Sequence, residues 1–503
     1  MSHYHLDTPL DIAKLREIAL GKSKVSLSNI TAEKLEKGHN YLIDHISKGE
    51  TVYGVNTGFG PLVDNNVDDE AIRELQENLL QQLSGNVGPE VPAPIVRAVM
   101  AARARALALG VSGVRAVVVH SLSEMINAGI TPVLKQYGSV GASGDLVPLS
   151  RIARTLTGKD YLKLADGSIV DNSAETMKKH NVTKLNLSPK EGLGLVNGTS
   201  YSATLAAHSI SVLKFLLSEI AIPVSVTLQI IFRDNLQHFH PEIYAYKAHQ
   251  TAKDTAAEFR KWLPETDFSK ALGDNLQPPY SSRSIVLWLG TVMEHLAQAE
   301  KVIETELNSV DDNPLIYPEE NLILHAANFQ GTYAAKAADD TSLGFAKLAI
   351  AVERQINRIL HDKLNGSLPA FLAEEPVGLH SGIQGFQLTA TSLLSDIRAR
   401  AVAHGIQSTP TNADNQDIVS MSANAANNAS EIADRAIVLS AIFTSTIARA
   451  LQLTNPKLPK PLQTFWDNKN LSDIDFSRAN LAEVLEKQIS EIKGACGFYD
   501  VGI

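Results

Sequence analysis

The sequence of 503 residues contains a single cysteine, Cys496, and only three tryptophans. One cysteine cannot build an internal disulfide framework, and such sparse use of cysteine is typical of a reducing compartment. The first residues, MSHYHLDTPLDIAKLREIA, lack the cationic segment and the following apolar segment of a secretory signal peptide. These absences predict a cytoplasmic protein.

Clusters of positive charge and long apolar runs are also missing. The 45 basic and 55 acidic residues are dispersed along the chain and give a net charge of −10. Without a basic stripe, a nucleic-acid partner is not expected. The most apolar run, LSEIAIPVSVTLQIIF, contains Glu219 and Pro223, which favours a buried helix over a membrane span. The composition therefore predicts a globular protein without a membrane or nucleic-acid partner.

The hydrophobic periodicity predicts a mainly α-helical protein that changes character along the chain. In residues 1–200, short helical segments alternate with glycine-rich loops, whereas residues 201–503 contain long helices with few breaks. The clearest predicted long helices are Ser200 to about Ile231, about Ser284 to Ser309, Ala334 to Leu364, and Ser422 to Thr454. They exceed the usual helix length of roughly 12 residues, so we expect an extended helical bundle behind an N-terminal domain.

The usual catalytic signatures are absent, and one glycine-rich stretch takes their place. The chain has no GxxxxGK[ST], HExxH, CxxC or GxSxG motif, but it contains GSVGASGDLVPLS at residues 138–150. Attack of the Gly144 nitrogen on the Ala142 carbonyl would close a five-membered ring, because glycine allows a tight bend. Loss of water from Ser143 would then leave a methylidene, a strong electrophile. The alternative interpretation is a turn in which Asp145 caps the helix LVPLSRIARTL.

Further motifs favour the first interpretation. They are VYGVNTGFG (52–60), EGLGLVNGTS (191–200), QPPYSSRS (277–284), ELNSVDDNPLI (306–316), HAANFQG (325–331) and NADNQDIVSM (412–421). Together with GSVGASGDLVPLS they resemble, over nearly the whole chain, the aromatic amino acid ammonia-lyase family, which includes the histidine, tyrosine and phenylalanine ammonia-lyases. In that family an Ala-Ser-Gly triplet cyclises to 4-methylidene-imidazol-5-one (MIO). The resemblance places MIO on Ala142, Ser143 and Gly144.

The resemblance also assigns roles to other residues. Tyr53 is expected to remove the β-proton of the substrate, although a phenol is a weak base unless its phenolate is stabilised. Tyr280 is expected to help carry protons, and Arg283 to hold the substrate carboxylate in a bidentate fork. The residues expected to contact MIO or the substrate are Asn197, Gln277, Asn313, Phe329, Gln330, Asn415 and Gln416.

Two positions bear mainly on the substrate ring. The histidine and tyrosine enzymes carry a histidine where this chain has Leu83, and the phenylalanine enzymes carry an apolar residue there. An apolar side chain leaves a polar ring atom unpaired, which costs about 1–3 kcal/mol. The histidine enzymes have a glutamate at Gln416, and Gln330 also fits the phenylalanine type better. We expect a phenylalanine-like substrate, while the polar neighbours Gln81 and Gln82 leave hydroxyl and methoxy ring substituents open.

The resemblance thus implies conversion of an aromatic L-amino acid to a trans-arylacrylate of the cinnamate type and ammonia, with no metal and no diffusible cofactor. It implies a mainly α fold of the fumarase/aspartase-like superfamily, of compact bacterial type. It also implies a homotetramer in which several subunits build each active site. The alternatives are a tyrosine or histidine ammonia-lyase, an aromatic 2,3-aminomutase, and a catalytically silent structural member of the superfamily. The intact triplet, Tyr53 and Arg283 weigh against the silent member.

Overall fold

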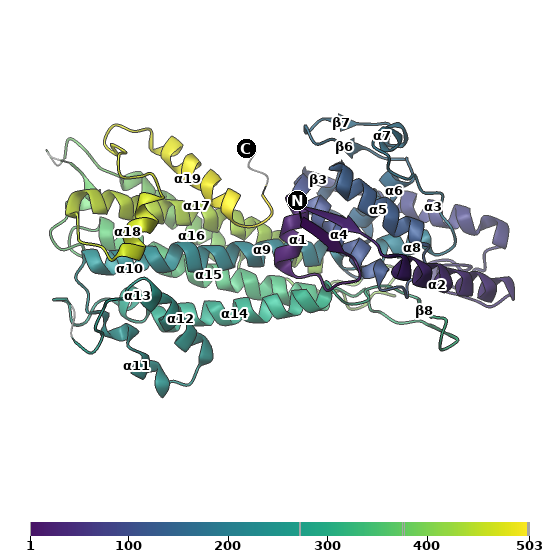
Figure 1. Ribbon diagram of the computed structural model, residues 1–503, viewed down its shortest axis with the longest axis horizontal. Helices are drawn as coiled ribbons and strands as arrows, with labels where there is room; N and C mark the ends of the chain where they lie inside the picture. Colours follow the sequence, from purple (N-terminus) through teal and green to yellow (C-terminus); the bar gives the residue numbers. More distant parts are fainter. Residues whose placement is uncertain (1, 271–272, 375, 377, 500–503) are drawn as a thin grey trace.

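The computed structural model describes residues 2–270, 273–374, 376 and 378–499. The protein is elongated, with a bundle of long helices at one end and a group of shorter helices and small sheets at the other (Figure 1). The mainly helical fold class expected from the sequence is confirmed. The division of the chain at residue 200 stays a prediction.

Short elements make up the N-terminal part. Its helices are α1 Ile12–Ala19, α2 Asn29–Ser47, α3 Ile72–Gln82, α4 Ala93–Ala108, α5 Ala116–Ala128, α6 Leu146–Leu156, α7 Ser173–Lys179 and α8 Glu191–Val196. Its strands are β1 Ser2–His5, β2 Ser23–Ser26, β3 Val87–Glu90, β4 Thr131–Pro132, β5 Lys135–Tyr137, β6 Leu162–Lys163 and β7 Ile169–Val170. β1 pairs with β2 in parallel, β3 pairs with β5, and β4, β6 and β7 form a three-stranded antiparallel sheet.

Long helices form the bundle. They are α9 Ser200–Phe215, α10 Ile222–Ile231, α12 Gln250–Lys261, α14 Ile285–Glu306, α15 Thr332–Leu360, α16 Gln384–Arg400 and α17 Ser422–Thr454. The shorter α11 Pro241–Ala245, α13 Tyr280–Arg283, α18 Lys460–Asp467 and α19 Leu481–Ala495 lie around them, and the hairpin β8 Leu315–Tyr317 and β9 Leu322–Leu324 reaches back to α2. Small buried residues such as Ala425, Ala429 and Ala433 let α17 lie close to α9, α15 and α16.

The predicted helix over Ser200 to about Ile231 is interrupted. A π-helical segment, Leu216–Ala221, separates α9 from α10. It lies just before Pro223, whose nitrogen has no hydrogen to donate to the carbonyl one turn earlier, so the regular bonding pattern cannot continue there. The stretch is buried, as predicted from the sequence. Helix α16 was not among the long helices expected.

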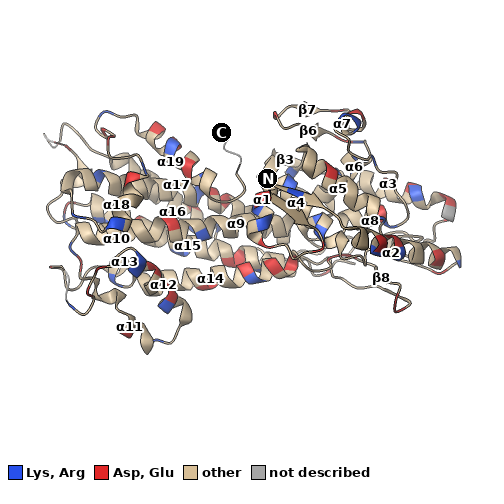
Figure 2. Ribbon diagram, in the orientation of Figure 1, with Lys and Arg blue, Asp and Glu red and all other residues tan. Residues whose placement is uncertain are grey.

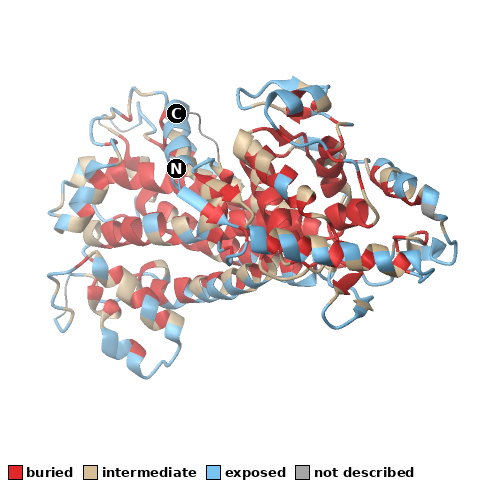
Figure 3. Ribbon diagram, turned by 45° about the vertical axis from the view of Figure 1, so that its right-hand side comes forward, coloured by how far each residue is buried: buried red, intermediate tan, exposed pale blue. Residues whose placement is uncertain are grey.

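Burial agrees with a bundle core rather than a membrane span for the apolar helices. Glu191–Ile231 and Ser422–Thr454 are long and apolar enough to cross a membrane, but 72% and 78% of their most apolar segments are buried inside the protein. Figure 3 shows buried residues along the interior of the helices and exposed residues at the loops. Figure 2 shows positive and negative residues interspersed along the chain.

Candidate active site

The loop that contains the Ala-Ser-Gly triplet lies where three bundle helices begin. The Gly141 carbonyl accepts hydrogen bonds from Ser420 Oγ (2.7 Å), just before α17, and from the nitrogen of Gly331 (3.3 Å), just before α15. The nitrogen of Asp145 donates to the carbonyl of Gly198 (2.7 Å), which shortly precedes α9. The loop is therefore anchored on both sides of the triplet. The positive ends of the three helices favour negative charge in this region.

The triplet itself occupies a tight bend that requires glycine. Gly144 has a φ of +70°, and a Cβ at this position would lie 2.4 Å from backbone atoms of Gly198. The Ser143 carbonyl accepts a hydrogen bond from Asn197 Nδ2 (2.8 Å), and the Ser143 hydroxyl accepts one from Gln416 Nε2 (2.7 Å). Ser143 is partly exposed, whereas its neighbours Ala142 and Gly144 are buried. The tight bend at Gly144, where a Cβ has no room, and the partly exposed side chain of Ser143 fit the MIO group.

The carboxylate of Asp145 joins this loop to the first turn of α9 and does not cap α6. It precedes α6, but its carboxylate makes no capping hydrogen bond to that helix. Instead, Oδ1 accepts from the Ser139 hydroxyl, and Oδ2 accepts from both the nitrogen and the hydroxyl of Ser202. Burial raises the pKa of Asp145 to about 6. The alternative interpretation of the stretch as a simple turn with a side-chain cap is therefore wrong for Asp145.

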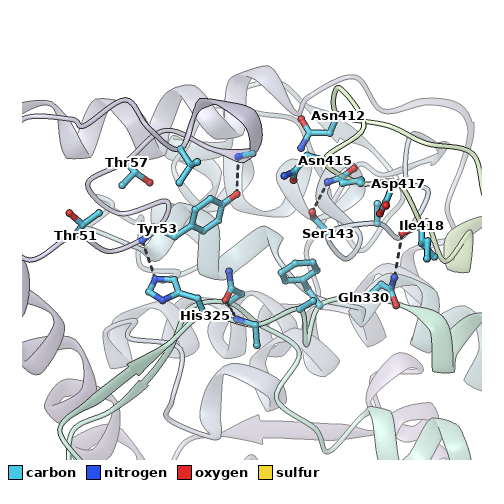
Figure 4. Close-up of a pocket in the computed structure, with 18 residues that line it drawn as sticks. Thr51, Tyr53, Thr57, Ser143, His325, Gln330, Asn412, Asn415, Asp417 and Ile418 are labelled. Carbon is cyan, nitrogen blue, oxygen red and sulfur yellow. Dashed lines mark hydrogen bonds between the residues drawn. The ribbon is translucent and has the colours of Figure 1, made fainter.

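A cavity of about 840 Å³ opens above Ser143, and Tyr53 lies in its wall (Figure 4). The hydroxyl oxygen of Tyr53 accepts a hydrogen bond from the nitrogen of Gly60 (2.8 Å), and the backbone nitrogen of Tyr53 donates to Nε2 of His325 (3.3 Å). The ring of Phe59 packs edge-on against the Tyr53 ring at 6.5 Å. A backbone N–H aimed at the phenol oxygen stabilises negative charge there, which a tyrosine base requires.

The remaining walls carry most of the expected binding residues. The cavity is lined by Tyr53, Ala142, Ser143, Asn313, Phe329, Gln330, Asn415 and Gln416, together with Thr51, Thr57, Gly60, Val63, His325, Ala326, Ala327, Asn412, Asp417 and Ile418. Two predicted amides have structural partners: Asn313 Oδ1 accepts from the Ala326 nitrogen (2.7 Å), and Gln330 Nε2 donates to the Ile418 carbonyl (3.4 Å). Both amides hold the cavity wall in place.

Leu83 is not among the residues that line this cavity. It is half-buried at the end of α3, where its carbonyl accepts a hydrogen bond from the Ser150 hydroxyl (2.9 Å) of α6. The side chain of Gln81 turns away to an exposed position and accepts a hydrogen bond from Arg154. The selectivity role of Leu83 stays a prediction.

Gln277, Tyr280 and Arg283 lie far from the triplet of their own chain. Near the triplet, α15 begins after Gly331. Further along α15, Gln355 Nε2 donates to the carbonyl of Ser281 (2.7 Å), two residues before Arg283. At about 1.5 Å per residue, this length of helix spans about 36 Å. Figure 1 shows α13 at the end of the bundle remote from α6, which follows the triplet. Within one chain, Arg283 therefore lies far from Ser143.

Arg283 is nevertheless poised for a ligand. Its guanidinium lies 5.0 Å from the centre of the Tyr280 ring, and Tyr280 is 72% exposed. The Nε atom of Arg283 is buried without a hydrogen-bond partner in the described part of the chain. Such an arrangement suits a group that binds an oxyanion supplied from outside the chain.

Buried charged side chains stabilise the segment around Thr199, close to the triplet loop. Arg103 pairs with Asp311 (2.7 Å), whose other oxygen accepts from the nitrogen of Thr199 (2.8 Å). The Thr199 hydroxyl donates to Glu306 (2.6 Å), and burial raises the pKa of Glu306 to about 7. Lys190 pairs with Asp312 (2.8 Å) beside Asn313. Within the described ranges, no group of three or more His, Cys, Asp or Glu side chains is arranged to hold a metal ion.

Sequence reasoning missed His325, which lines the cavity, and Thr411, which holds the cavity residue Gln416. His325 is the first residue of the motif HAANFQG, but no role was assigned to it. Thr411, whose hydroxyl donates to Gln416 Oε1 (2.6 Å), immediately precedes the motif NADNQDIVSM. Proximity to the quoted motifs was the available signal, but it does not reveal which side chains meet.

Known proteins are similar to this chain in both sequence and fold. The family model described as aromatic amino acid lyase matches residues 10–469. The tyrosine ammonia-lyase of Cupriavidus metallidurans is 38% identical over 405 residues, which are 76% of this chain and 75% of that protein. The histidine ammonia-lyase of Caldanaerobacter subterraneus is 33% identical over 444 residues, 88% of this chain and 86% of that protein.

A solved structure extends the likeness to three dimensions. The tyrosine aminomutase of Streptomyces globisporus matches with a TM-score of 0.89 at 30% identity, over 97% of this chain and 96% of that chain. The family expected from the motifs is thereby confirmed. Because the family model spans residues 10–469 and the relatives align over most of their length, the protein belongs to the aromatic amino acid lyase family and is a carbon–nitrogen lyase.

Proposed function

We propose that this enzyme removes ammonia from a phenylalanine-like aromatic L-amino acid and releases a trans-arylacrylate of the cinnamate type, at MIO formed from Ala142, Ser143 and Gly144. The observation that carries the proposal is the position of Ser143, exposed to the cavity whose wall contains Tyr53. When formed, MIO supplies the electrophile that makes the amine of the substrate a better leaving group.

The residues of the chain supply proton transfer and charge stabilisation. The Tyr53 oxygen receives the β-proton of the substrate, and the Gly60 N–H stabilises that oxygen in its charged form. Asn197 donates a hydrogen bond to the Ser143 carbonyl, and Gln416 donates one to the Ser143 hydroxyl. The helix ends that converge on the loop stabilise negative charge at the same place.

The substrate carboxylate requires a cation that one subunit does not provide. None of the described residues that line the cavity is a lysine or an arginine, and burial lowers the pKa of His325, which keeps it uncharged. Arg283 supplies the cation from a second subunit, together with Tyr280 and Gln277. The active form is accordingly a homotetramer with closed symmetry. We place it in the cytoplasm, with no metal and no diffusible cofactor.

Leu83 and Gln416 support a phenylalanine-like ring over imidazole, because neither pairs with a charged imidazole as a carboxylate does. A 2,3-aminomutase is the second candidate. The tyrosine aminomutase of Streptomyces globisporus covers 97% of this chain at 30% identity, and re-addition of ammonia uses the same electrophile.

Product analysis tests the proposal. Purified protein is incubated separately with L-phenylalanine, L-tyrosine, L-histidine and a methoxy-substituted L-phenylalanine, and products are followed by NMR. We expect cinnamate-type acids and little urocanate. Urocanate as the main product refutes the argument from Leu83 and Gln416, and a β-amino acid as the main product identifies an aminomutase. Mass spectrometry of the peptide that contains Ser143 should show the loss of two waters.

A further inference from the structure

His325 joins the cavity wall to the loop that carries Tyr53. The backbone N–H of Tyr53 donates to His325 Nε2 at 3.3 Å, although the two residues are separated by 272 positions in the chain (Figure 4). At the other end of Tyr53, the Gly60 nitrogen donates to the hydroxyl oxygen at 2.8 Å. Tyr53 is therefore held by one hydrogen bond at its backbone and one at its side chain.

His325 is itself firmly placed. It follows β9, in which Leu324 pairs with Leu315 of β8. The next residue, Ala326, donates its N–H to the side chain of the buried Asn313 (2.7 Å). With an anchor on each side, the backbone of His325 is a fixed point against which the Tyr53 loop can be held.

The Tyr53 loop needs such a point because glycines follow the tyrosine in the loop. Gly54 and Gly60 adopt φ values of +66° and +56°, conformations that glycine enters and leaves at little cost. A loop with glycine at these positions does not hold a side chain in place through its own backbone preferences. Contacts to other segments must do so.

The direction of the hydrogen bond fixes the state of the imidazole. A backbone N–H can only donate, so His325 Nε2 must present a lone pair, and the proton of the neutral ring is on Nδ1. Burial lowers the pKa of His325, and no charged side chain contributes to the shift. The titratable groups on the other segments around the cavity are Tyr53 and Asp417. Protonation of Nε2 would set two donors against each other and break the contact.

We propose that His325 is a positioning residue that holds the Tyr53 loop in its catalytic place through an unprotonated Nε2, and that its protonation sets an acid limit to activity. This inference rests on the proposed function only in that Tyr53 is the base. His325 does not need to touch the substrate. The partner of the imidazole is the backbone N–H of Tyr53.

Two variants separate this role from others. His325→Gln keeps an acceptor at a similar reach but does not titrate, whereas His325→Leu keeps comparable bulk without an acceptor. A matched control is His120→Leu, at an exposed position on α5 away from the cavity lining. For each protein, kcat and KM are measured from pH 5 to pH 9 on the amino acid that the wild type turns over best, and MIO content is measured by peptide mass.

We expect His325→Leu to lose about tenfold in kcat with little change in KM, as for one lost positioning hydrogen bond. His325→Gln should keep most of the neutral-pH activity, and its activity should extend to lower pH than that of the wild type. All variants should retain MIO. The inference is overturned if His325→Leu is as active as wild type, if His325→Gln is as impaired as His325→Leu, or if only KM changes. It is also overturned if the acid limb stays in place in His325→Gln.

Amide hydrogen exchange tests the contact independently of activity. The peptide that covers residues 52–60 should exchange faster in His325→Leu than in wild type, and at the wild-type rate in His325→Gln and His120→Leu. Equal exchange in all four proteins overturns the inference even if the enzyme is an active lyase. Failure of every amino acid to react refutes the proposed function instead, and the exchange result then still decides whether His325 holds the loop.

Discussion

The separation of Arg283 from the triplet predicts that two inactive variants will restore activity when they share a tetramer. Ser143→Ala cannot lose the water that creates the electrophile. Arg283→Met removes the carboxylate fork, and breaking a buried charge pair of this kind costs about 3 kcal/mol, or more than a hundredfold in rate. Each variant alone should therefore be nearly inactive.

The size of the restored activity follows from the geometry. In one chain, α15 spans about 36 Å between Gly331, which contacts the triplet loop, and Gln355, which contacts the segment of Arg283, so we expect a site that contains both groups to take them from different subunits. With equal and random mixing, half of the triplets and half of the arginines are intact. About a quarter of the sites then contain both, so the mixture should reach about a quarter of wild-type kcat.

The assay uses co-expression of the variants with two different affinity tags and purification through both tags. Wild type carrying the same two tags sets the reference activity, and each singly expressed variant sets the background. A doubly tagged mixture no more active than its parents would show that both groups act within one subunit or that Arg283 has no part in the site. The reasoning from the bundle length would then be refuted.

Other predictions concern the base, the bend and a buried acid. Tyr53→Phe keeps the ring against Phe59 but removes the proton acceptor, so kcat should fall at least about a hundredfold, while peptide mass still shows the loss of two waters; near-normal kcat would exclude Tyr53 as the base. In Gly144→Ala the new Cβ would lie 2.4 Å from the Gly198 backbone, so we expect both waters to remain on the triplet by mass spectrometry, and full dehydration would contradict this. The pKa of Glu306 rises from 4.5 to about 7 on burial, so the contribution of this residue to the free energy of unfolding is most favourable below pH 4.5, and at most about 3 kcal/mol of it is lost as the pH rises through 7. Urea unfolding at pH 5 and pH 8 should show a smaller difference for Glu306→Gln than for wild type, and equal differences would argue against a shifted Glu306.

Local sequence determined the helical nature of the bundle and the presence of the Ala-Ser-Gly triplet. The helix over Ser422–Thr454 was predicted with its observed ends because neither glycine nor proline interrupts the run. The boundary at Pro223 was less predictable, since a proline in a buried helix is accommodated by a π-helical segment rather than by a full break. Periodicity reports which face of a helix is buried, and it does so wherever the run is long.

Motif matching placed Tyr53, Asn197 and Gln416 around the triplet, but only the tertiary structure decided how they are held. The hydrogen bonds of the Asp145 carboxylate with Ser202 of α9, and of the Gln416 amide with Ser143, depend on how separate segments pack together. Such contacts follow from packing between distant segments, which local propensity does not encode.

The positions of Ser143 and Arg283 illustrate most clearly what the sequence and the tertiary structure each decide. The sequence by itself determined that this chain contains both an Ala-Ser-Gly triplet and the motif QPPYSSRS. Only the tertiary structure decided that the two motifs lie near opposite ends of α15, which spans about 36 Å between Gly331 and Gln355, because an α-helix adds about 1.5 Å per residue and cannot fold back on itself. The same structure decided that His325 meets Tyr53, because the β8–β9 hairpin carries the histidine back to the N-terminal part of the molecule.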